Sequence, residues 1–127
     1  MFRLPGQALV MRWLLLGENA PATLIRSAVD CVRWTGPAAL AGRTKAALRV
    51  DATKAFMRCP VPMLYRGGTQ DRLIDVQTAA QMKALRHDLE CVMQDAPHFL
   101  LQRAPAAAVE AIAEFLSRIG PSGRCAG

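Results

Sequence analysis

The spacing of apolar residues changes near residue 59. From residue 5 to residue 58 they recur at intervals of three and four, which is typical of helices that bury one face. After residue 59, two short apolar runs alternate with two further helical patterns. The pattern therefore predicts an α/β fold with two parts, a helical segment over residues 1–58 and a β-α-β-α unit over residues 59–120.

Proline and glycine set the boundaries of the helices in the first part. Gly17 and the pair Gly36-Pro37 are natural stop and start signals. We predict three helices and one short helical turn, at residues 5–17, 22–34, 37–49 and 52–58. Asp51 or Thr53 is placed to cap the last of these.

Two of these helices have apolar faces that predict burial. The first has a broad apolar face that includes Leu9, Trp13 and Leu16, so we expect it to be well buried. The third is expected to turn one side inward, formed by Leu40, Ala41, Thr44, Ala47 and Leu48.

The second part alternates between strands and helices. Val61–Tyr65 and Leu89–Met93 are short apolar runs bounded by turn residues, which favours buried strands. Gln77–Arg86 and Pro105–Ile119 carry helical patterns. This order predicts two parallel strands joined by a right-handed crossover. Ligands and chemistry sit at the carboxyl ends of such strands.

Asp71 and His98 each follow the carboxyl end of one predicted strand, so their side chains can meet. Asp71 lies after a turn in which Gly67 and Gly68 allow backbone angles that a side chain would forbid. It either orients a catalytic histidine or only caps its own turn. His98 beside an apolar run is either structural or the partner of Asp71. We take the two as the candidate catalytic pair.

Other titratable residues have simpler explanations. Asp75 stands where it can cap the following helix, and Asp95 could share the rim of the pocket around His98. His87 follows a helix end, where the helix dipole favours it. Cys91 lies within a strand and is expected to be a small buried hydrophobe.

A nucleophile is missing from the expected positions. Ser27, Ser117 and Ser122 are the serines of the chain, and none stands in a G-x-S-x-G turn after a strand. Phosphate-binding, dinucleotide-binding and metal-binding motifs are also absent from the sequence. We therefore expect neither a cofactor nor a metal.

Composition and charge narrow the possible partners and the cellular location. The net charge is +6 and the pI is about 9.8, but the basic residues are scattered and no aromatic residues alternate with them, so we expect no nucleic-acid partner. The run Leu9–Leu16 is too short to span a membrane.

Four widely spaced cysteines, Cys31, Cys59, Cys91 and Cys125, suggest reduced thiols and a cytoplasmic protein. An apolar share of 52% in so small a chain suggests that some apolar surface meets a partner.

Two stretches together resemble the α/β-hydrolase superfamily. Cys59–Ile74, with an apolar strand followed by Gly68-Thr69-Gln70-Asp71, looks like the strand and loop that carry the acid. Asp95–Leu101, with Pro97 before His98, looks like the histidine loop. The last helix is similar to the family's closing helix, and residues 1–58 are similar to its helical lid.

The resemblance covers the C-terminal half of that fold and implies a partial α/β-hydrolase. Asp71 would orient His98, and His98 would act as general base and then general acid in the hydrolysis of an ester or similar acyl bond. Trp13 and Trp34 would help to line an apolar acyl pocket. The serine nucleophile would come from an N-terminal hydrolase half on another chain, or the gene is truncated, so we expect this chain to be inactive alone.

An interpretation from a different class stays open. The chain could be a non-catalytic interaction module that self-associates through the exposed edge of its small sheet. In either case residues 121–127 are expected to form a frayed tail.

Overall fold

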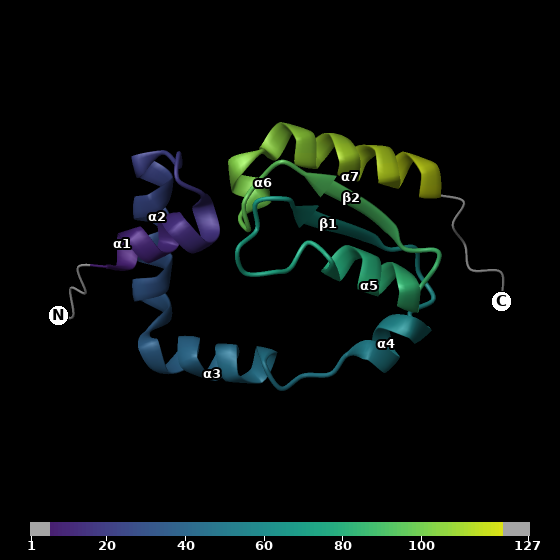
Figure 1. Cartoon of the computed structure of the whole chain (residues 1–127), viewed down its shortest axis with the longest axis horizontal. Helices are drawn as coiled ribbons and strands as arrows, with labels where there is room; N and C mark the ends of the chain where they lie inside the picture. Colours follow the sequence, from purple (N-terminus) through teal and green to yellow (C-terminus); the bar gives the residue numbers. More distant parts are fainter. Residues whose placement is uncertain (1–5, 121–127) are drawn as a thin grey trace.

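The computed structural model describes residues 6–120, which form a mixed α/β fold with a two-stranded parallel sheet (Figure 1). Predictions about the tail 121–127, including Ser122 and Cys125, lie outside these residues. The elements in chain order are α1 (Gln7–Val10), the π-helix η1 (Met11–Leu16), α2 (Ala22–Thr35), α3 (Pro37–Ala47), α4 (Thr53–Arg58), β1 (Leu64–Gly68), α5 (Thr78–Leu85), β2 (Glu90–Gln94), α6 (Leu100–Arg103) and α7 (Pro105–Ile119).

The parallel pairing of β1 and β2 confirms the predicted β-α-β-α order. The register runs from Leu64 opposite Glu90 to Gly68 opposite Gln94. β1 begins three residues later than the predicted start at Val61 and continues through both glycines. Proline explains the late start, since Pro62 has no N–H to contribute to a strand ladder. The hydrogen bonds between the two strands begin only where the Glu90 N–H donates to the Met63 carbonyl at 3.1 Å.

The helices α5 and α7 lie on opposite sides of the strand pair (Figure 1). Side chains alternate accordingly. Leu64 faces α7, where it lines a hollow with Ile112 and Leu116. Cys91 faces α5, and its sulfur lies 3.8 Å from the Ala79 carbonyl. The expectation of a small buried hydrophobe at Cys91 therefore holds only in part, because the residue is half-buried.

The two glycines of β1 are needed for space and not for unusual backbone angles. Among the described residues, positive φ occurs at Gly17, Gly36 and Gly120, so the conformational role predicted for Gly67 and Gly68 is wrong. A Cβ on Gly67 would lie 2.8 Å from the Met93 sulfur. A Cβ on Gly68 would collide with the backbone carbonyls of Ala96 and Pro97. At the carboxyl end of the sheet, the backbone at Gly68 therefore crosses closely over the loop after β2.

The first helix is less buried than its apolar face predicts. Leu9, Val10 and Trp13 are each more than half exposed, and only Leu16 is fully buried. The reason is that only the last turn of η1 reaches the loops at the carboxyl edge of the sheet, where the Phe99 N–H donates to the Leu15 carbonyl at 2.9 Å. α2 packs against α1 and η1.

The predicted burial of α3 is wrong for all five of its inward positions. Leu40, Ala41, Thr44, Ala47 and Leu48 are exposed, and Leu48 is 82% exposed. Figure 1 shows α3 standing away from the sheet, so no described element covers its apolar side. The short helix α4 does follow the predicted cap, because the Asp51 carboxylate accepts a hydrogen bond from the Thr53 N–H at 2.9 Å.

Arg86 joins the end of α4 and the segment before β1 to the turn before β2, near the amino end of the sheet. Its buried guanidinium donates to the carbonyls of Cys59 at 2.7 Å and Val61 at 2.9 Å and pairs with Asp88. Backbone carbonyls in an irregular segment need such donors, because no ladder satisfies them. This side chain therefore fixes the entry of the chain into β1.

The crossing at Gly68 gives a test of the fold. Gly68→Ala should lower the free energy of unfolding by about 1–3 kcal/mol, because the added methyl group forces the two loops apart. Gly42→Ala is the control, since a Cβ there meets nothing within 4 Å and removes a glycine from the middle of α3. The control should be neutral or stabilising by about 0.5–1 kcal/mol. Urea unfolding curves measure both, and equal midpoints for the two variants would contradict the close crossing.

Candidate functional site

Asp71 and His98 meet at the carboxyl edge of the sheet, as predicted. The His98 Nδ1 atom lies 2.8 Å from the Asp71 Oδ2 atom. Asp71 comes from the loop after β1 and His98 from the loop after β2, so the contact joins residues 27 positions apart. The parallel register brings both loops to one edge, which is why sequence spacing was sufficient to predict the contact.

The Asp71 carboxylate makes the contacts that both interpretations require, because it caps its own turn and also meets His98. Its Oδ1 atom accepts hydrogen bonds from the backbone N–H groups of Leu73 at 2.8 Å and Ile74 at 2.9 Å. Its Oδ2 atom faces His98. Burial raises the pKa of Asp71, but hydrogen bonds from the Ile74 N–H, His98 and the Leu73 N–H outweigh burial and lower the pKa below its ordinary value. The group is therefore an anion at neutral pH.

Backbone hydrogen bonds hold the two loops together beneath this pair. The Thr69 N–H donates to the Gln94 carbonyl at 2.8 Å, and the Gln70 N–H donates to the Ala96 carbonyl at 3.1 Å. Asp95 adds a side-chain link, because it accepts hydrogen bonds from the Thr69 hydroxyl at 3.2 Å and the Gln70 amide at 2.7 Å. Asp95 therefore ties the two loops together.

An ionised Asp71 fixes the tautomer of His98. A carboxylate only accepts hydrogen bonds, so Nδ1 must carry the proton, and Nε2 is left with a free lone pair when the ring is neutral. The half-buried ring borders a hollow of about 530 Å³ formed by β1, α6 and α7. The lining of this hollow is mostly apolar, with Leu64, Phe99, Leu100, Leu101, Ile112, Phe115 and Leu116.

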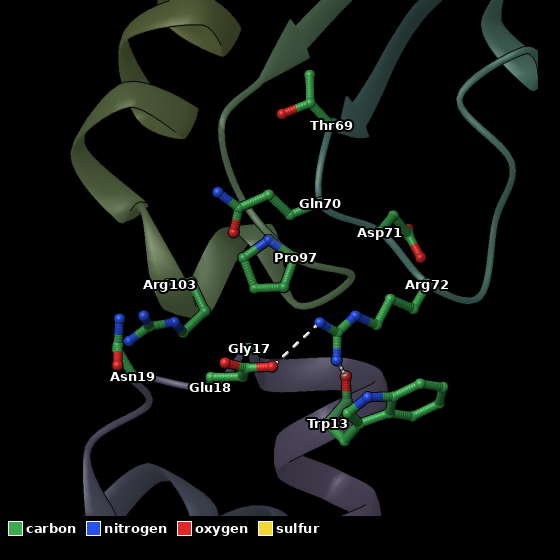
Figure 2. A pocket seen from close by; sticks show the side chains of 10 residues that line it. All are labelled: Trp13, Gly17, Glu18, Asn19, Thr69, Gln70, Asp71, Arg72, Pro97 and Arg103. Atoms are coloured by element: carbon green, nitrogen blue, oxygen red, sulfur yellow. Dashed lines mark hydrogen bonds and ion pairs between the residues drawn. The ribbon is translucent and has the colours of Figure 1, made fainter.

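A second cavity, of about 490 Å³, lies between the end of η1 and the loops after β1 and β2 (Figure 2). Its lining is polar. Arg72 donates to Glu18 at 3.2 Å and to the Trp13 carbonyl at 3.2 Å, and its guanidinium lies 4.9 Å from the centre of a Trp13 ring. Trp13 therefore borders a polar cavity and not the expected apolar pocket. Trp34 is 90% exposed and lines neither cavity.

The remaining candidates lie away from the pair. Asp75 caps the start of the α5 region, because its carboxylate accepts a hydrogen bond from the Gln77 N–H at 2.8 Å. His87 stands in an exposed turn beyond the end of α5. The described serines use their hydroxyls within their own helices, Ser27 donating to the Thr23 carbonyl at 3.1 Å and Ser117 to the Glu114 carbonyl at 2.7 Å. Neither is placed as a nucleophile.

Sequence reasoning missed three arginines near the site. Arg72 holds η1 to the loop after β1, Arg66 on β1 hydrogen-bonds to the Gln94 side chain, and Arg103 on α6 borders the polar cavity. A cation directly after Asp71 was a visible signal for Arg72. Arg66 and Arg103 gave none, because only the folded chain brings α6 and β1 to this edge.

The lowered pKa of Asp71 predicts acid sensitivity. A carboxyl group with a folded-state pKa below its unfolded value stabilises the fold above about pH 4, and this contribution is lost as the pH falls through the folded-state pKa. Asp71→Asn should therefore show a smaller loss of unfolding free energy between about pH 5 and about pH 2.5 than the wild type. His98→Gln should fall between the two. Urea unfolding at each pH measures this, and identical slopes for all three proteins would contradict it.

The site as a whole holds an imidazole beside an apolar hollow, with its Nδ1 atom toward a buried carboxylate. Within residues 6–120, no three His, Cys, Asp or Glu side chains gather closely enough to hold a metal ion. The helices of that part of the chain include none with the length and apolarity needed to cross a bilayer.

In comparisons with known proteins, no family model, no curated protein and no solved structure matches this chain.

Proposed function

We propose that this chain is the acid-and-base half of an α/β-hydrolase-like enzyme that hydrolyses ester or similar acyl bonds. One observation carries the proposal. The buried, ionised Asp71 holds the Nδ1 atom of His98 at 2.8 Å, at the carboxyl edge of two parallel strands. A structural histidine needs no buried anion behind it, whereas a general base gains orientation and charge stabilisation from one.

The chemistry follows from the tautomer. The His98 Nε2 lone pair would accept the hydroxyl proton of a serine as its oxygen attacks the acyl carbon, and Asp71 would stabilise the imidazolium that forms. His98 would then return that proton to the leaving alcohol as the acyl–oxygen bond breaks. Water would repeat the sequence to release the acid and free the serine.

The apolar hollow beside His98 is the candidate acyl pocket. Its volume of about 530 Å³ lies in the range of small-molecule sites. α6 and α7 supply most of its lining. The acyl pocket would thus be formed by the last two helices and not by the two tryptophans of the N-terminal helices.

The serine and its oxyanion hole would come from an N-terminal hydrolase half that adjoins β1. Cys31, Cys59 and Cys91 form no disulfide within residues 6–120, which supports a reducing compartment and the cytoplasm. The basic residues are scattered along the sequence, so we propose a small acyl substrate without a nucleic-acid partner.

Reconstitution tests this function. The chain would be co-expressed with the polypeptide encoded by the preceding reading frame and assayed with a short-chain chromogenic ester. We expect turnover from the pair, and His98→Ala should lower kcat/KM by roughly 10²- to 10⁴-fold. His87→Ala, which changes the other histidine, is the matched control and should leave turnover unchanged. An inactive pair, or turnover that His98→Ala leaves intact, would overturn the proposal.

A non-catalytic interaction module is the second candidate, and the free edge of β1 favours it. The Glu90 N–H donates to the Met63 carbonyl and the Thr69 N–H to the Gln94 carbonyl, so odd-numbered residues of this stretch face β2. Backbone groups of Leu64 and Arg66 therefore face the other edge, where the described chain places no strand. Ile112, Leu116 and Leu101 expose apolar surface near this edge. Unpaired edges with apolar flanks promote association.

Sedimentation at increasing concentration tests this candidate. We expect self-association, and Leu116→Glu should weaken it by roughly tenfold or more, because a charge would be buried at the contact. Ser117→Glu puts the same charge on the next, exposed position of α7 and should change association by less than about twofold. A monomer at high concentration that binds no apolar dye would contradict this second candidate.

A further inference from the structure

We propose that the polar cavity between η1 and the loops after β1 and β2 binds a small molecule through an oxyanion, either a carboxylate or a phosphate, held by Arg103. The cavity is separate from the apolar hollow that His98 borders. The proposal therefore stands whether or not the chain takes part in ester hydrolysis, and binding can be measured without turnover.

Arg103 is the group that points to an anionic ligand. It is half-buried on α6, and its Nε atom is shielded from solvent without a hydrogen-bond acceptor in residues 6–120. None of the ion pairs within that range includes it. Arg103 also lines the cavity, so an anion bound there would meet a guanidinium that has no counter-charge in residues 6–120.

The other charges of the cavity already have partners. Glu18 pairs with Arg72 at 3.2 Å, and Asp71 is occupied by His98 and two backbone N–H groups. Arg103 is therefore the one charged side chain of the lining that lacks a counter-charge in the described chain. A carboxylate or a phosphate fits the fork of a guanidinium with two parallel hydrogen bonds.

The shape of the cavity supports a small ligand. Its volume of about 490 Å³ suits a metabolite-sized molecule and not a protein segment. Figure 2 shows Arg103 reaching from α6 toward Asn19, with the Glu18–Arg72 pair and Trp13 on the far side. Asn19 lines the same cavity, and its amide is a second possible donor to an anion there. The ring of Trp13 forms part of the wall and can report occupancy.

Trp13 fluorescence gives a direct binding test. The chain has two tryptophans, and Trp34→Phe removes the exposed one, which borders neither cavity. Inorganic phosphate and acetate would be titrated separately into this protein at constant ionic strength. We expect a saturable change, and the anion that binds more tightly identifies the class of ligand. Arg103→Gln should weaken that binding by roughly tenfold or more, because a charge-assisted hydrogen bond is lost.

Two further variants separate a specific site from general charge attraction. Arg26→Gln removes the same charge from an exposed position on α2 outside the cavity and should change affinity by less than about twofold. Arg103→Lys keeps the charge without the fork and should give an intermediate loss, which also covers the case in which Arg103→Gln unfolds. No saturable signal with either anion, or equal losses for Arg26→Gln and Arg103→Gln, would overturn the proposal.

Discussion

The close crossing of the two loops at the carboxyl end of the sheet is the constraint on which the candidate site depends. Gly68 leaves no room for a Cβ beside the carbonyls of Ala96 and Pro97. Because the loops pass this closely, the Gln70 N–H can reach the Ala96 carbonyl, and Asp71 emerges within hydrogen-bond distance of His98. A side chain at that glycine would separate the acid from the base, whatever else the fold preserved.

The same loops also hold the N-terminal helices to the sheet. The Leu15 carbonyl accepts from the Phe99 N–H, and the Arg72 side chain reaches back to Glu18 and Trp13. Gly17 closes the contact from the other side, since a Cβ there would lie 3.3 Å from the Pro97 ring. The polar cavity exists because η1 docks at this edge through a few polar contacts and leaves a space between them. The docking of η1 and the polar cavity therefore both result from the way η1 contacts the loops after β1 and β2.

Apolar surface is distributed unevenly between the two parts of the chain. The buried residues near the site are small and few, with Ala96, Leu100 and Ala108 packed together. Larger apolar side chains remain exposed elsewhere. They include Leu40 on α3, Leu48 just after it, and Val109, Ile112 and Leu116 on α7. The edge of β1, which has no partner strand in the described residues, lies near the part of this surface formed by Ile112 and Leu116. Both proposed functions explain that surface in the same physical way, because each covers it with another polypeptide.

The sequence alone determined the order of the elements, apart from the short helix α6, and the pairing of Asp71 with His98. Proline, glycine and apolar spacing act within a few residues, so they marked α7 at Pro105–Ile119 without error and placed β2 to within one residue. The tertiary structure alone decided which faces are buried, why Gly67 and Gly68 are required, and which arginines reach the site. Those properties depend on residues that approach from distant parts of the chain. A local pattern records that a helix has an apolar side, but it does not record whether anything packs against that side.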